Sequence, residues 1–358
     1  MMDEIKFSSV EEQMEKLEKQ GLVIKNKESA RLALSFFGYS NIIKSYRDPY
    51  IITSGSEEKY RSGTTFEQIF SLYLLDKNLR NAIMSAMQDL EEHIKELAAS
   101  AIASSFGTHQ DEYLKYQNYR NKKKKLYRFS LTGLLDSLQK TLNTDKDPIH
   151  HYNTEHGIVP PWILFKSIYF STMVNFIDLF KISEQDKIVH NLYSGENLGL
   201  KDANLRMLMK DTLSICLSYR NMAAHGGRIY NYKCPNTLRV NEIFEDPAVK
   251  QTTGICQLLF VLKLLNYPSP YLQLKKILND EVDRHCNLYP NDVTYLGQIL
   301  NLDIVPHSIV YVSESSNKYH LLPYCSGIKD PKPMDLEDAK SRHYVPCKRC
   351  IPKGVSIE

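Results

Sequence analysis

The sequence lacks the features that mark a membrane protein or a secreted protein. None of its apolar runs reaches the length of about 18 residues that a membrane-spanning helix needs. The first residues, Met1–Glu4, do not show the basic and then apolar pattern of a signal peptide. Cysteine is scarce and odd in number, at seven of 358 residues, which does not fit a framework of disulfides. These absences predict a cytoplasmic protein that does not enter a membrane.

The sequence also has little excess charge and little β-strand pattern. Lysine and arginine number 45 against 42 acidic residues, and the formal net charge is +3. This mildly basic balance permits nucleic-acid binding without arguing for it, because the distribution of charge matters more than the sum. Before residue 305, apolar residues recur mainly at helical spacing. We therefore expect an all-α helical bundle for the body of the chain.

Caps and glycines give the expected limits of these helices. Ser9 and Glu12 fit a capping box, and Thr64 with Glu67 fits another at the start of the longest helix. Residues 46–63 are rich in turn-forming residues and predict a loop. The expected helices are 8–20, 27–37, 64–106, 131–142, one that opens at 160, 203–225, 253–265 and 268–286.

The helix that ends near Gly226 carries the residues most suggestive of chemistry. Arg220 and His225 are five positions apart, about 7.5 Å along a helix and about 140° around it. A histidine can move a proton near neutral pH, and an arginine can hold a phosphate and neutralise charge that grows on it. Asn221 can orient either group. The alternative is that both are surface cations at a helix C-terminus, where positive charge is favoured anyway.

Paired acids lie in the middle of the longest expected helix. Glu91 and Glu92 are followed by His93 within the apolar stripe of that helix. A carboxylate there can orient the arginine or the histidine of a catalytic site. The alternative is a pair of solvated helix charges, since adjacent acids are common on helix surfaces.

A basic segment with aromatic neighbours follows the longest expected helix. Tyrosines lie in and beside it, and cations with interleaved aromatic rings suit an RNA backbone with bases stacked alongside. The alternative is a solvated basic loop. The six cations within nine residues are Arg120, Lys122, Lys123, Lys124, Lys125 and Arg128.

The C-terminal region predicts a small α+β module that binds Zn²⁺. Strands are expected at 309–312 and 318–322, and a short helix at 335–341. About fifty residues bury little core, so a metal would stabilise them. One imidazole and three thiolates form a closed tetrahedral donor set that leaves no position for water. The expected ligands are His320, Cys325, Cys347 and Cys350, with His343 in reserve. A redox-active or free Cys-x-x-Cys pair is the alternative.

Two stretches together resemble a known family. The string Arg220-Asn221-x-x-x-His225, continued through Gly226-Gly227 to Tyr230-Asn231, resembles the signature of HEPN ribonucleases. Residues 63–80 and 90–92 resemble the N-terminal block of the Abi-like abortive-infection family, of the AbiD/AbiF type. The similarity covers roughly residues 8–265. The C-terminal cysteine pattern is similar to an Ada-type metal-binding module.

The resemblance implies a fold, an activity and partners. The expected domains are an Abi-like HEPN domain at 1–290 and a zinc module at 305–358. The implied reaction is metal-independent RNA cleavage by attack of the ribose 2′-hydroxyl, which leaves a 2′,3′-cyclic phosphate and a 5′-hydroxyl. His225 would act as general acid or base, Arg220 would stabilise the transition state, and Asn221 would position them.

The resemblance also implies partners and a biological setting. Arg228 and Tyr230 would flank the cleavage site and contact RNA. HEPN sites are usually composite, so one motif per chain predicts a homodimer. The family is associated with phage defence by toxin-like growth arrest, and a small antitoxin RNA would hold the enzyme inactive. A non-catalytic RNA-binding protein and a zinc-dependent interaction module remain alternatives.

One helix entry resembles the family only in part. Pro160-Pro161-Trp162 matches the family's proline-proline-tryptophan pattern, but Lys166 and Tyr169 depart from the residues that usually follow. No role is therefore carried over to this helix, and we expect it to lie in the core or an interface.

Overall fold

The computed structural model describes residues 7–54, 57–122, 126–302, 304, 309–320, 325 and 327–350. It is mostly helical with a small C-terminal sheet region, as the sequence predicted. The chain divides into two compact units: residues 1–79 and 276–358 form unit 1, and residues 80–275 form unit 2. The domain limits expected from the sequence, 1–290 and 305–358, stay a prediction. Within the described ranges, no helix is both long enough and apolar enough to cross a membrane.

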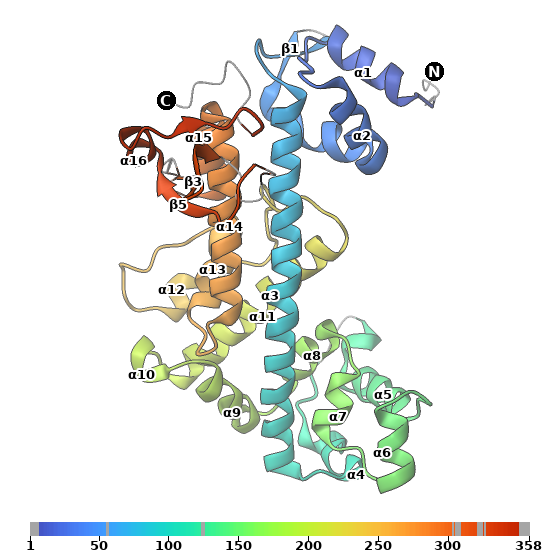
Figure 1. Ribbon diagram of the computed structural model, residues 1–358. Coiled ribbons are helices and arrows are strands. Elements are labelled where there is room, and N and C mark those ends of the chain that lie inside the picture. The colour runs from blue at the N-terminus through green and yellow to red at the C-terminus, as the bar shows by residue number, and fades with distance from the viewer. Residues whose placement is uncertain are drawn as a thin grey trace. The chain divides into compact units, whose positions relative to one another are not determined.

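Unit 1 begins with two helices that pack together, α1 (Val10–Lys19) and α2 (Lys27–Phe37) (Figure 1). The predicted capping box is present: Ser9 N–H donates to Glu12 Oε2 at 2.7 Å, and Glu12 N–H donates to Ser9 Oγ at 3.2 Å. These reciprocal bonds satisfy amide groups that the first helical turn leaves unpaired. The sequence therefore predicted this helix start correctly.

The expected loop at 46–63 contains a β-hairpin, so that prediction was wrong. After the single turns η1 (Ser40–Lys44) and η2 (Asp48–Tyr50), strand β1 (Ile51–Ser54) pairs antiparallel with β2 (Glu57–Tyr60). Each strand has only four residues and several are polar or charged, so the sequence shows no clear apolar alternation. Pairing between the strands supplies the stability that the local pattern does not show.

Helix α3 (Phe66–Phe106) contributes residues 66–79 to unit 1 and residues 80–106 to unit 2. Its start differs slightly from the prediction. Thr65, not Thr64, accepts the N–H of Gln68 through Oγ1 at 3.1 Å. Glu67 does not close a capping box; its Oε1 accepts the amides of Lys25 and Asn26, each at 3.0 Å. The carboxylate therefore connects the helix start to the segment before α2.

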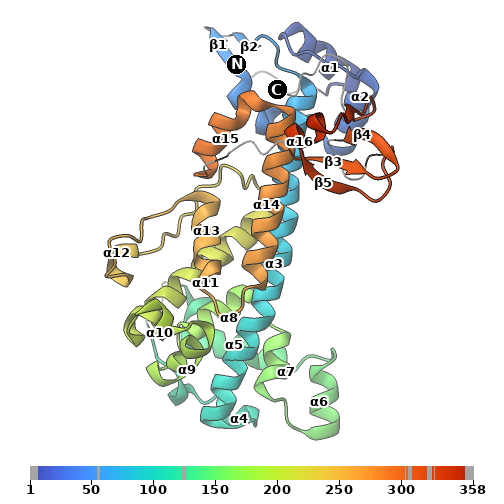
Figure 2. The same ribbon diagram turned by 60° about the vertical axis from the view of Figure 1, so that its left-hand side comes forward.

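Unit 2 is built from helices around α11 (Asp202–Ala224), which packs against α8, α9, α12 and α13. A second group gathers around α5, which packs against α6, α7 and α8 (Figure 2). The remaining elements of unit 2 are α4 (Gln110–Tyr113), η3 (Tyr116–Asn118), η4 (Tyr127–Phe129), α5 (Leu131–Leu142), α6 (Ile149–His156), α7 (Pro161–Lys166), α8 (Phe170–Ile177), α9 (Ile182–Leu192), α10 (Gly195–Leu198), α12 (Val240–Ile243) and α13 (Gly254–Lys263).

The chain returns to unit 1 within α14 (Ser269–Leu288), followed by η5 (Pro290–Asp292) and α15 (Val293–Leu300). A buried polar network holds this return segment. His285 Nε2 lies 2.9 Å from Asp292 Oδ2, and His285 Nδ1 lies 3.0 Å from Ser71 Oγ. Tyr50 and Gln68 donate to the same carboxylate at 2.6 and 2.9 Å. The network ties the hairpin region and α3 to the end of α14.

The C-terminal module contains the two predicted strands and the predicted helix, and it adds two short strands that the sequence did not predict; residues 321 and 322 of the second expected strand lie outside the described residues. Strand order is β5-β3-β4-β6, with antiparallel pairing of β3 to β4 and to β5 and parallel pairing of β4 to β6. Its small core, gathered on Val312, Tyr319 and Leu336, also receives Leu288 of α14. The elements are β3 (Ile309–Ser313), β4 (Ser316–His320), β5 (Lys332–Asp335), α16 (Leu336–Ser341) and β6 (Val345–Pro346).

Candidate functional site

Arg220 lies on the wall of a cleft of about 720 Å³ formed by α3, α7 and α11. We call it the Arg220 cleft. Its guanidinium makes no ion pair within the described part of the chain, and its one hydrogen bond there is a long 3.5 Å contact from Nη1 to Asn221 Oδ1. Most donors of this side chain are therefore available to a ligand. The lining residues are Met84, Gln88, Glu91, Glu92, Lys95, Glu96, Trp162, Lys166 and Arg220.

The α3 residues that line the Arg220 cleft include the acids that the sequence singled out. Glu91 pairs with Lys95 at 2.7 Å, and the lysine Nζ also donates to the carbonyl of Ile168 at 2.6 Å. Glu92 is exposed and faces the same cleft. Glu92 therefore lines the same cleft as Arg220, whereas the carboxylate of Glu91 is already paired with Lys95.

The end of α11 is a Schellman motif, and it places His225 outside the cleft. Gly226 N–H donates to the carbonyl of Ala223 at 3.1 Å, and Gly227 N–H donates to that of Met222 at 2.9 Å. Gly226 has φ of +70°, the left-handed conformation predicted for a glycine there. His225 is the C-cap and is exposed. The side chain of Arg220 therefore lines the cleft, whereas that of His225 is exposed at the end of the helix.

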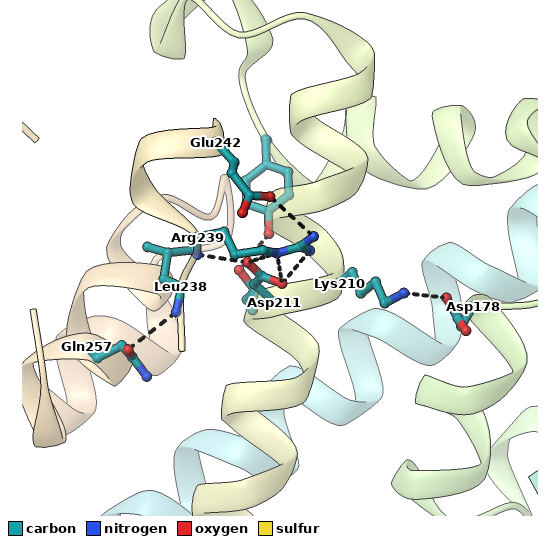
Figure 3. A network of polar contacts seen from close by, with 9 residues as sticks. Asp178, Lys210, Asp211, Leu238, Arg239, Glu242 and Gln257 are labelled. Carbon is teal, nitrogen blue, oxygen red and sulfur yellow. Dashed lines mark hydrogen bonds and ion pairs between the residues drawn. The ribbon is translucent and has the colours of Figure 1, made fainter. Parts of the chain in front are cut away.

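The packing of α11 is fixed by a bidentate ion pair. Arg239 donates to both oxygens of Asp211, from Nη2 to Oδ1 at 2.7 Å and from Nε to Oδ2 at 3.0 Å (Figure 3). The Arg239 amide adds a bond to Asp211 Oδ2 at 3.0 Å, and Leu238 N–H donates to Gln257 Oε1 at 3.4 Å. Such a fork geometry is specific as well as strong, so the segment before α12 is held against the middle of α11.

The residues expected to bind RNA lie in unlike environments. Lys122 Nζ bonds Asp178 Oδ1 at 2.8 Å, and Arg120 Nη2 bonds the Asp178 carbonyl at 3.0 Å. Arg128 is exposed, with its guanidinium 4.6 Å from the centre of the Phe129 ring. Lys123, Lys124 and Lys125 lie outside the described residues.

The two expected contacts after the glycine turn are less accessible. Arg228 is half-buried, and Tyr230 is buried with 2% of its surface exposed. A ring so enclosed does not present a face on which a base could stack. Tyr230 therefore contributes to packing in this conformation.

The predicted metal ligands come together in the C-terminal module. The ligand atoms of His320, Cys325, Cys347 and Cys350 all lie within 4.8 Å of one another. Cys325 Sγ is 4.0 Å from Cys347 Sγ, and Cys350 Sγ is 3.7 Å from His320 Nδ1. Thiolates bound to one tetrahedral Zn²⁺ lie about 3.8 Å apart, given Zn–S bonds of about 2.3 Å. The spacing fits a shared ion and is too long for a disulfide.

The surroundings of this cluster also fit a cation. Burial alone would raise the pKa of Cys347, but backbone amides of Arg349 and Cys350 donate to the sulfur and lower it below the usual thiol value. The buried Nε2 of His320 has no hydrogen-bond partner in the described chain. A Cβ on Gly327 would come within 3.3 Å of His320 Cε1, so a glycine is the residue that leaves this ring room. The cluster of His320, Cys325, Cys347 and Cys350 could thus hold Zn²⁺.

Sequence reasoning missed several residues around these sites. Trp162 and Lys166 of α7 line the Arg220 cleft, although their helix had been expected only to pack. Asp178 pairs with both Lys122 and Lys210, and Figure 3 shows the contact between Lys210 and Asp178. No sequence signal relates these positions to the sites, because Trp162 and Lys166 come from α7, Asp178 follows α8 and Lys210 lies in α11, and only the packing brings them to the sites.

The comparisons with known proteins give one family. The family model described as Abi-like protein matches residues 33–231, more than half of the chain, and the matched range contains Arg220, Asn221 and His225. Neither the curated proteins nor the solved structures gave a match.

Proposed function

This chain belongs to the Abi-like protein family, and we propose that it is a metal-independent endoribonuclease of the HEPN type. Membership of the family suggests a role in abortive infection, the defence of bacteria against phage. In the proposal the protein is the toxin of an abortive-infection or toxin–antitoxin system. A small antitoxin RNA holds it inactive until infection.

The observation that carries the proposal is the position of Arg220. Its guanidinium lines a cleft large enough for a nucleotide and has donors to spare. In the proposed reaction the ribose 2′-hydroxyl attacks the adjacent phosphate, and the 5′-oxygen leaves with a proton. Arg220 binds the charge that grows on the phosphate, and Asn221 orients the arginine. His225 takes or supplies the proton.

The position of His225 supports the expected homodimer. Among the described residues that line the Arg220 cleft there is no histidine, and His225 is exposed at the end of α11. A second copy of the chain can place the C-terminal end of its own α11 at the Arg220 cleft of the first copy. In that arrangement each active site takes Arg220 from one protomer and His225 from its partner. Mixing chains that carry Arg220→Ala with chains that carry His225→Ala would then restore part of the activity.

The test is RNA cleavage by the purified full chain in EDTA, with assignment of the product ends. We expect 2′,3′-cyclic phosphate and 5′-hydroxyl ends. His225→Ala should lower the rate by about 10²- to 10⁴-fold, and Arg220→Ala by about 10²- to 10³-fold. His156→Ala and Arg31→Ala, both at exposed positions, are the matched controls and should cleave at the wild-type rate. Equal cleavage by all variants would contradict the proposal.

A non-catalytic RNA-binding protein is the second candidate. The cations Arg120 and Lys122, together with exposed Arg128, favour it because they lie apart from the Arg220 cleft. Tight, salt-dependent RNA binding that survives both Arg220→Ala and His225→Ala, without any cleavage, would support this candidate instead. A zinc-dependent interaction module is the third, and zinc content without RNA affinity would support it.

The C-terminal cluster is proposed as a structural zinc site. His320, Cys325, Cys347 and Cys350 would supply all four ligands, so no position remains open for a water or a substrate. The metal would hold β4 to the Cys347–Cys350 turn and has no part in the proposed cleavage.

A further inference from the structure

A second cavity of unit 2, of about 390 Å³, is lined by cations from separate parts of the chain. We call it the Asp178 cavity. Arg120 and Lys122 enter it from the segment after η3, whereas Arg206 and Lys210 enter it from α11. It shares no lining residue with the Arg220 cleft. The two sites are therefore separate surfaces of unit 2.

The cations of this cavity exceed the acids that neutralise them. Of the five cations that line it, Arg206 is paired with Asp186 and Arg239 with Asp211, which leaves three cations of the cavity for one carboxylate. Lys122 and Lys210 both bond the same oxygen, Asp178 Oδ1, at 2.8 and 3.3 Å. Arg120 reaches only the carbonyl of Asp178, so its charge has no acid within this group. About two positive charges remain uncompensated among the described residues here.

The cation group is held in place by the backbone. Tyr119 and Phe180 form an antiparallel bridge, and the Arg120 amide donates to the Leu179 carbonyl at 2.8 Å. The Nε of Arg120 is buried and has no hydrogen-bond partner in the described chain. Burial lowers the pKa of Lys122, although the hydrogen bond that its ammonium donates to Asp178 opposes this, and the nearby charges of Arg120 and Lys210 lower the pKa further. A second anion beside these cations would relieve that repulsion.

We propose that the Asp178 cavity binds the phosphate group of a terminal nucleotide. A phosphomonoester carries a charge of about −1.5 to −2 near neutral pH, which matches the uncompensated charge, whereas an internal phosphodiester carries only one. Arg120 offers a planar guanidinium fork, and Lys122 and Lys210 offer ammonium donors. Met207, Met209 and Leu213 give the cavity an apolar wall on which a base or ribose can pack.

Two sources supply this chemistry: the 5′-phosphorylated end of an RNA and a free nucleoside monophosphate. The inference rests on the proposed function only in taking RNA as one of the sources. An RNA end seated here would fix the strand at a defined place on unit 2. The cleavage reaction need not work for the cavity to bind phosphate.

The experiment measures binding of short RNA oligonucleotides to the full chain by fluorescence anisotropy. The oligonucleotides are 2′-O-methylated, so cleavage cannot occur, and differ only in a 5′-phosphate or a 5′-hydroxyl. Adenosine monophosphate and inorganic phosphate are added as competitors. We expect the 5′-phosphate to tighten binding about tenfold or more, since a hydrogen bond to a charged group is typically worth about that factor. Competition by adenosine monophosphate alone, without this preference, would identify the free nucleotide as the source.

Variants with opposite expected effects on the preference for the 5′-phosphate distinguish a loss of binding from misfolding. Lys122→Met with Lys210→Met should abolish the preference for the 5′-phosphate, whereas Asp178→Asn, which removes the competing carboxylate, should strengthen it. Lys201→Met, which changes a lysine of unit 2 with 85% of its side chain exposed and outside the cavity, is the matched control. Equal affinity for both oligonucleotides, with no competition by adenosine monophosphate, would overturn the inference.

The outcome is independent of the proposed ribonuclease. A chain that cleaves unmodified RNA but shows no phosphate preference overturns this inference and leaves the proposed function intact. A chain that binds the 5′-phosphate and does not cleave RNA contradicts the proposed function and leaves this inference intact.

Discussion

His285, Ser71 and Asp292 show how a familiar set of residues can be structural. Their spacing is that of a serine–histidine–carboxylate hydrolase triad, with histidine nitrogens 3.0 Å from Ser71 Oγ and 2.9 Å from Asp292 Oδ2. His285 has no exposed surface, and Ser71 and Asp292 are 5% and 6% exposed. A nucleophile must meet its substrate, so this buried set can position α14 and η5 but cannot act on a ligand from solvent.

Removal of the Asp292 carboxylate should strongly destabilise unit 1. Buried Tyr50 and His285 and half-buried Gln68 would lose their shared acceptor, and each unsatisfied buried group costs about 1–3 kcal/mol. We expect Asp292→Ala to lower the free energy of unfolding by about 3 kcal/mol or more in urea titrations. Asp280→Ala, at an exposed position of α14, should change it by less than about 0.5 kcal/mol. A small effect of Asp292→Ala would show that the network contributes little.

At the scale of the element, the end of α11 decides where His225 points. The Schellman motif stops the helix one residue after Ala224, and the left-handed Gly226 turns the chain away. A residue with a side chain pays a steric cost in that conformation, although asparagine tolerates it better than alanine. The glycine thus links local backbone geometry to the placement of the proposed general acid or base.

Gly226→Ala should therefore destabilise the helix end and impair cleavage. The expected loss of unfolding free energy is about 1–2 kcal/mol, measured by thermal or urea unfolding. Gly226→Asn should lose less in both stability and RNA-cleavage rate, because it preserves the left-handed turn at lower cost. If the two variants behave alike, the conformation of residue 226 does not control the site.

At the scale of the whole molecule, the C-terminal module combines a small core with a cluster of four residues that could hold a metal. Its buried apolar cluster is limited to a few side chains around Val312, Tyr319 and Leu336. A core of that size does not offset the entropy of ordering the surrounding segments. In the proposed zinc site, Zn²⁺ bound by His320 and the three cysteines would supply the missing stability.

Metal removal should unfold this module selectively. We expect about one zinc ion per purified chain by elemental analysis. After chelation, amides of residues 309–350 should lose protection from hydrogen exchange, whereas those of α11 should keep it. Cys347→Ser should reproduce the loss, and Cys234→Ser, at a half-buried cysteine outside the cluster, should not. Unchanged protection in the metal-free chain would exclude a structural role for zinc.

Much of the fold was readable from the sequence because its signals are local. The Ser9–Glu12 capping box, the limits of α2 and the glycine stop after α11 each depend on residues within a few positions. The hairpin β1–β2 was missed since its short, polar strands are stabilised by pairing rather than by pattern. The four residues of the C-terminal cluster were identified because the Cys-x-x-Cys spacing restricts the chemistry before any folding is known.

The sequence by itself determined the helical body, the C-terminal strands and the identity of the residues able to handle a phosphate, a proton or a metal. Only the tertiary structure decided which of them meet. Arg220 lines one cleft together with glutamates of α3 and a tryptophan of α7, and Lys122 shares the carboxylate of Asp178 with Lys210, which lies far away along the chain. The physical reason is that caps, periodicity and ligand spacing act over a few residues, whereas a cavity is formed by side chains from helices whose packing no local pattern encodes.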